Sequence, residues 1–141
     1  MKANELMIGD WVQKLEVGGH YHKGQIKAII DDNVDVATSD GEIHTLSVNG
    51  IEPIPLTGEI LEKNGFKVGH YLVGLAELPE YKMVNRKDLK DIEKNVITIR
   101  QSSNVLFDMQ VGIGSHIFDI TYVHELQHAL RLCGIEKEIE L

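Results

Sequence analysis

Short segments with strand character recur at close spacing between Leu6 and Leu56, and this spacing constrains the fold more than any other feature. Each segment is bounded by a glycine or by a turn rich in Asp and Asn, and several alternate between apolar and polar residues. Such alternation is typical of strands that bury one face and expose the other. The predicted strands are Asp10–Gln13, Gln25–Ile30, Val34–Thr38, Glu42–Val48 and Ile51–Ile54.

Asp40-Gly41 lies between two of these strands and is a hairpin signal. A long glycine-containing loop, 16–24, follows the first strand. Five short strands in this pattern resemble an SH3-like β-barrel, in which closure of the sheet removes most exposed edges. We therefore predict an SH3-like barrel domain at residues 1–55. Barrels of this kind bind peptides or nucleic acid, or serve as structural modules, so the fold alone selects no function.

The rest of the chain predicts a second, α+β domain at residues 56–141. A helix capped by Thr57 and ended by Gly65 opens it, and an amphipathic helix from Tyr122 closes it. Between them we expect an antiparallel sheet packed by the two helices. Its predicted parts are strands at Tyr71–Leu75 and Tyr81–Val84 around a turn at Glu77–Glu80, a helical turn at Arg86–Lys94, and strands at Asn95–Gln101 and Asn104–Val111 linked by Ser102-Ser103. The fold class is mostly β, or α+β.

Charge and hydropathy limit the partners. The net charge of the 141-residue chain is −8, and the basic cluster Asn85–Lys90 is interrupted by an acid. Binding to nucleic acid needs clustered Lys and Arg, so we expect no nucleic-acid partner. No apolar run approaches the roughly 18 residues that cross a bilayer, and no signal peptide is evident, so we expect a cytoplasmic protein with no membrane partner. The single Cys133 lies on an apolar helix stripe, which indicates a buried small side chain.

The last predicted helix contains a His-Glu-x-x-His motif. On a helix this spacing places His124 and His128 one turn apart on one face, as zinc ligands, with Glu125 beside them as the general base of a hydrolase. The positions that hold the further glycine and third histidine in one class of such enzymes are Arg131 and Gly134 here. His70 or His116 would complete a site only if the fold brought one of them near.

An apolar stripe explains the same helix without a metal. The stripe places His124, Gln127, His128 and Arg131 on the opposite, solvent-facing side. Its members are Tyr122, Val123, Leu126, Ala129, Leu130 and Cys133. We therefore predict no metal and no cofactor, with zinc as the alternative.

Three segments carry a resemblance to a known family. Asn4–Val12, Ile54–Phe66 and Tyr122–Gln127 resemble the corresponding segments of small proteins of unknown role from gut anaerobic bacteria and their phages. In that family the position of His128 is typically Asn, and that of Glu125 is Glu or Gln. The resemblance implies a bacterial or phage origin. It also implies that a zinc site would depend on His128, the residue in which this chain departs from the family.

These observations favour a non-enzymatic protein-interaction module with an unknown protein partner, and a zinc-dependent hydrolase is the alternative. Trp11 and Tyr21 are the candidate interaction surface, since two aromatics of an SH3-like barrel are able to form a groove for a proline-rich peptide. Against this, Trp11 lies inside a predicted strand, where a large aromatic usually fills the core. His20 and His22 lie in the long loop with no third metal ligand nearby, and we expect them to be solvated.

Overall fold

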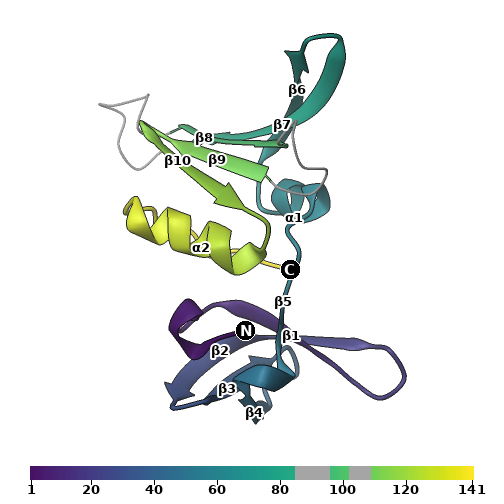
Figure 1. Cartoon of the computed structure of the whole chain (residues 1–141), viewed down its shortest axis with the longest axis vertical. Coiled ribbons are helices and arrows are strands. Elements are labelled where there is room, and N and C mark those ends of the chain that lie inside the picture. The colour runs from purple at the N-terminus through teal and green to yellow at the C-terminus, as the bar shows by residue number, and fades with distance from the viewer. Residues whose placement is uncertain (85–95, 102–108) are drawn as a thin grey trace. The chain divides into compact units, whose positions relative to one another are not determined.

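The computed structural model describes residues 1–84, 96–101 and 109–141. They form two compact units, Met1–Pro55 with Tyr122–His124, and Leu56–Thr121 with Glu125–Leu141. The described residues contain two five-stranded antiparallel sheets and two α-helices (Figure 1). The prediction of a mostly β, α+β chain is therefore confirmed.

The first sheet has the strand order β4-β3-β2-β1-β5. Its last strand pairs with its first, through Val12 opposite Pro53 and Gln13 opposite Glu52. Because β5 is only two residues long and β4 remains at the other end, closure into a barrel is not seen among the described residues. The elements are β1 (Trp11–Leu15), β2 (Tyr21–Ile30), β3 (Asn33–Thr38), β4 (Ile43–Ser47) and β5 (Glu52–Pro53), with short 3₁₀ turns η1 (Ala3–Glu5) and η2 (Val48–Gly50).

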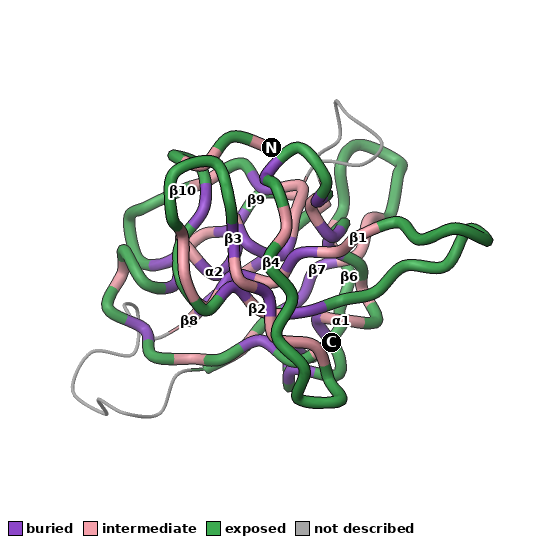
Figure 2. The backbone as a smooth tube through the Cα atoms, turned by 90° about the horizontal axis from the view of Figure 1, so that it is seen from below, coloured by how far each residue is buried: buried purple, intermediate pink, exposed green. Residues whose placement is uncertain are grey.

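One face of this sheet carries the core of the first unit. Gly24 allows β2 and β3 to pack closely, because a Cβ there would lie 2.5 Å from Cγ1 of Val36 and 2.7 Å from the carbonyl oxygen of Ala37. Figure 2 shows, by contrast, that the hairpin between β1 and β2 is exposed. The buried core residues are Leu6, Val12, Ile26, Val34, Val36, Val48 and Ile51.

The second sheet has the strand order β10-β9-β8-β7-β6. The register places Tyr81, Ile99 and Val111 in one row across β7, β8 and β9, and all three are buried. Figure 1 shows both α-helices on the same side of this sheet. The elements are α1 (Gly58–Lys63), β6 (Lys67–Val73), β7 (Ala76–Val84), β8 (Val96–Gln101), β9 (Met109–Ile113), β10 (His116–Ile120) and α2 (Val123–Leu132).

The hairpins of the second sheet differ from the predicted ones. The β6–β7 turn is Gly74-Leu75, so the predicted turn at Glu77–Glu80 is wrong and these residues belong to β7. Gly74 has a φ of 61°, as the first central residue of a type II′ turn requires. Strand β10 was not predicted as a strand. The predicted helical turn at Arg86–Lys94 and the Ser102-Ser103 link lie outside the described residues.

The C-terminal tail packs into the second unit through Asn64 at the end of α1. The Asn64 side-chain amide donates to the carbonyl of Glu140 and accepts from its N–H, both at 2.8 Å. Next to it, Ile139 is buried. Thr57 caps the start of α1 by accepting from the N–H of Ile60, as predicted. The Asn64 amide also donates to the carbonyl of Ile60 at 2.8 Å, so side chains satisfy backbone groups at both ends of α1.

We predict that Asn64→Ala lowers the free energy of unfolding of the second unit by about 1–3 kcal/mol, because it removes both hydrogen bonds between the Asn64 side chain and the backbone of Glu140. Urea denaturation followed by circular dichroism measures the change. Asn49→Ala, at an exposed asparagine of the first unit, is the matched control and should leave stability nearly unchanged. Equal stability of the two variants would contradict the role of Asn64.

Candidate functional site

Helix α2 forms where predicted, and on its polar side Arg131 is exposed, as predicted, whereas His124 and Gln127 are buried. His124 is 6% exposed and Gln127 is 4% exposed, so the expectation that both face solvent is wrong. His128 is half-buried. The His124 ring stacks on the Tyr122 ring, with centroids 5.9 Å apart and planes 13° apart. His124 therefore has a packing role in this structure.

Glu125 has a structural role at the start of the same helix. Its carboxylate accepts a hydrogen bond of 2.7 Å from the backbone N–H of Thr121. Glu125 is the third residue of α2, so a negative charge there also lies near the positive end of the helix dipole. This arrangement is close to a capping box, in which a glutamate in the first turn satisfies an N–H that precedes the helix.

Among the described residues, no third ligand lies with His124 and His128 to complete a zinc site. Within the described ranges, no three His, Cys, Asp or Glu side chains come together in a group able to hold a metal ion. Cys133, at the end of α2, is half-buried, and burial raises the pKa of its thiol. A raised pKa disfavours the thiolate that binds metals or attacks substrates.

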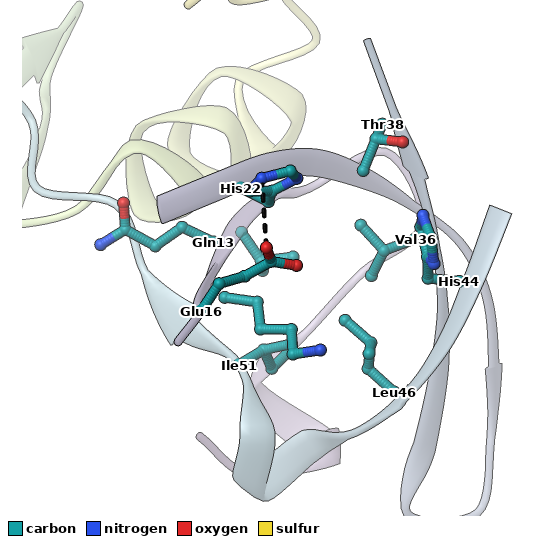
Figure 3. Close-up of a pocket in the computed structure, with 10 residues that line it drawn as sticks. Gln13, Glu16, His22, Val36, Thr38, His44, Leu46 and Ile51 are labelled. Atoms are coloured by element: carbon teal, nitrogen blue, oxygen red, sulfur yellow. Dashed lines mark ion pairs between the residues drawn. The ribbon is translucent and has the colours of Figure 1, made fainter. Parts of the chain in front are cut away.

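A hollow of about 40 Å³ lies in the first unit, where the core face of the sheet continues past the buried cluster (Figure 3). Its floor is apolar and consists of Val12, Val36, Leu46 and Ile51. Leu46 lies opposite Val34 in the register, which places it on the core face of β4. Pockets for small-molecule ligands measure roughly 300–1,000 Å³, so this hollow accommodates a small apolar group and not a cofactor.

The rim of the hollow is polar and comes from two hairpins. Glu16 and His22 of the β1–β2 hairpin form an ion pair of 3.4 Å on one side. His44 of β4 lies on the other side and pairs with Glu42 at 3.4 Å. Figure 3 shows Glu16 with His22 facing His44 and Leu46 across the hollow. His22 belongs to β2 and not to a loop, but its side chain is 55% exposed, so the expectation that it is solvated is confirmed.

Two further charges adjoin this rim. The Thr38 hydroxyl donates to the Asp40 carboxylate, and this bond lowers the pKa of Asp40. Lys14 lines the hollow opposite His22 in the β1–β2 register. Glu16 and Lys14 therefore line the hollow itself, and the carboxylates of Asp40 and Glu42 contact the lining residues Thr38 and His44.

Trp11 and Tyr21 lie on one face of the β1–β2 pair, and a groove between them stays a prediction. Trp11 is opposite Gln25 and Tyr21 is opposite Leu15, with the Gln13–Lys23 pair between them. This is the face away from Val12 and the core. Trp11 is half-buried and does not belong to the buried core cluster, whereas Tyr21 is exposed.

A second polar cluster lies on the second sheet, on the face opposite Tyr81. Glu80 is buried and pairs with Lys82 at 2.8 Å and with Arg100 of the neighbouring strand. Burial alone would raise the pKa of Glu80, but the hydrogen bonds and charges of Lys82 and Arg100 outweigh it and lower that pKa. Arg100 also lies 5.0 Å from the centre of the Tyr71 ring. These contacts join β6, β7 and β8, which is a structural role.

Comparison with known proteins finds no matching family model, no matching curated protein and no matching solved structure. The described helices include none that is both long enough and apolar enough to span a bilayer. The resemblance to proteins of gut anaerobes and their phages therefore stays a prediction.

We predict that Glu125→Ala lowers the free energy of unfolding by about 0.5–2 kcal/mol, the usual range for the loss of a helix cap. Urea denaturation measures the effect. Glu138→Ala, at an exposed glutamate in the tail, is the matched control. If the Glu125 variant were as stable as this control, the capping role would be refuted.

Proposed function

We propose that the chain is a non-enzymatic protein-interaction module whose first unit binds a short extended segment of a partner protein. The observation that carries the proposal is the hollow at the end of the first sheet. Its floor extends the apolar core, and its rim offers the imidazoles and carboxylates of Glu16, His22 and His44. A site of this size suits one anchoring side chain, with polar contacts to the backbone on either side.

We further propose that the first unit is an SH3-like barrel. The support is the pairing of β1 with both β2 and β5, which brings the first and last strands together as closure begins. Binding sites in β-barrels often lie at the mouth of the barrel. The hollow lies on the concave, core-bearing face, so it corresponds to such a mouth.

The chemistry of the partner follows from the rim. The carboxylate of Glu16 at the rim, and those of Asp40 and Glu42 beside the rim residues Thr38 and His44, favour a segment that carries Lys or Arg. The small apolar floor favours a neighbouring Val, Ala or Pro side chain and excludes a large aromatic one. The preferred segment is therefore extended, with a small apolar residue flanked by basic residues.

The roles of the His-Glu-x-x-His residues also favour a module over a hydrolase. Glu125 satisfies the backbone N–H of Thr121, and His124 is packed against Tyr122. The resemblance to proteins of gut anaerobes and their phages supports a cytoplasmic role in bacterial or phage biology. Nucleic acid is not proposed as a partner, since the net charge is −8.

A random-peptide display library selected on the full chain tests the site. We expect enrichment of peptides with a small apolar residue beside Lys or Arg. His44→Trp covers the hollow and should weaken binding of an enriched peptide at least tenfold, about 1.4 kcal/mol, in a fluorescence titration. Tryptophan suits a strand position, so the variant should fold.

Ile43→Trp is the matched control. Ile43 is the neighbouring residue of the same strand, points to the opposite face and is 64% exposed. The Ile43→Trp variant should bind the peptide as tightly as the unmodified chain does. Equal binding by the His44 variant, or enrichment of acidic peptides, would refute the proposed site.

A further inference from the structure

The second sheet has free strand edges, and they are protected unequally. Among the described residues, no strand pairs with the outer edges of β6 and β10. Natural sheets block free edges with charges or proline, since an open edge pairs readily with another chain. Strand β10 carries the charged Asp119. The question is how β6 and the projecting part of its hairpin are protected.

The projecting part of β7 is blocked on its far side. Residues 76–79 of β7 pair with β6 but not with β8, so the hairpin extends past the sheet (Figure 1). In a two-residue hairpin the residues that flank the turn, here Val73 and Ala76, form a hydrogen-bonded pair, and the pairs then alternate. This alternation directs the backbone of Glu77 and Pro79 away from β6. The charge of Glu77 and the missing N–H of Pro79 therefore protect that side of β7 against pairing.

As far as the described residues show, the outer edge of β6 carries no such protection. By the same alternation, the backbone N–H and C=O groups of Val68, His70 and Leu72 point outward. The strand is seven residues long, and its one formally charged side chain, Lys67, lies at its end. Leu72 is 74% exposed and Val68 is 49% exposed, and Leu75 at the turn is fully exposed. This is an open, apolar edge.

We propose that two copies of this chain pair through β6, antiparallel and centred on His70, to form a symmetric dimer. The edge is self-complementary in this register. Val68 of each copy lies opposite Leu72 of the other, and both are residues whose backbone N–H and C=O groups point outward from the hairpin. Gly69 lies opposite Tyr71, so no two large side chains face each other at that pair. Lys67 lies opposite Val73, so the strand's charge meets no like charge.

A second copy fits this edge better than an unrelated peptide does. When two β6 strands pair, the outward backbone groups of both copies find hydrogen-bond partners, and the exposed apolar side chains of both edges are covered. The other edge of each β6 is already paired with β7, whereas a single peptide strand would keep one edge unpaired. The dimer joins the second sheets of the two copies into one continuous sheet, with the two β6 strands side by side at its centre. The hollow of the first unit has no part in this pairing, so the proposal stands independently of the proposed function.

Sedimentation equilibrium of the full chain, at about 1–100 µM, tests the dimer. The expected result is a concentration-dependent rise from 15.8 kDa to twice that mass. Leu72→Lys should remain monomeric throughout, because it places a charge on the edge. It should also fold, since the introduced lysine lies opposite Glu77 in the hairpin and pairs with it. Leu132→Lys, at a leucine that is 73% exposed on α2, is the matched control and should dimerise normally.

A mixture of two variants tests the register. Val68→Glu alone should be monomeric, like Leu72→Lys alone. Mixed together they should form a heterodimer, because the lysine introduced in one copy then faces the glutamate introduced in the other. A monomer at every concentration, normal dimerisation of Leu72→Lys, or failure of the mixture to associate would overturn the proposal.

Discussion

The alternation of the antiparallel strand is the constraint on which the rest of this structure depends. In the first unit it places Val12, Val36 and Leu46 on one face, so that a single concave surface holds both the core and the hollow. In the second unit it separates the buried row of Tyr81, Ile99 and Val111 from the polar row of Glu80 and Arg100. The same alternation decides which backbone groups of an outer strand point toward solvent.

Local patterns predicted most of the elements. The strands of the first unit, the Thr57 cap and the final helix follow from alternation, capping residues and an apolar stripe, and these depend only on neighbours along the chain. The misplaced turn of the β6–β7 hairpin has a physical cause. Glu77–Glu80 contains a proline and two acids, yet Pro79 is tolerated in β7 because its missing N–H faces away from β6, on a side where none of the described strands pairs with it. Gly74 was the better turn signal, since it supplies the positive φ.

The candidate site was harder to predict, because it depends on which distant residues share a face. His22 and His44 come from different hairpins, so no motif along the chain joins the two. The alternation of β4 does indicate that His44 and Leu46 share a face, which was the one usable signal. Trp11 and Tyr21 were proposed from residue type alone, and the register separates them. The burial of His124 could not be read from α2 by itself, since a helix pattern gives one stripe and not what packs on the other side.

The central claim is that the chain acts by binding and that its His-Glu-x-x-His residues serve the fold. The zinc content of untagged protein, measured by mass spectrometry after dialysis against zinc, tests it most directly. The account predicts far less than stoichiometric zinc, and the same low content in His128→Asn, whose asparagine is the residue typical of the resembled family. Stoichiometric zinc that is lost in His128→Asn would contradict the account and favour the hydrolase.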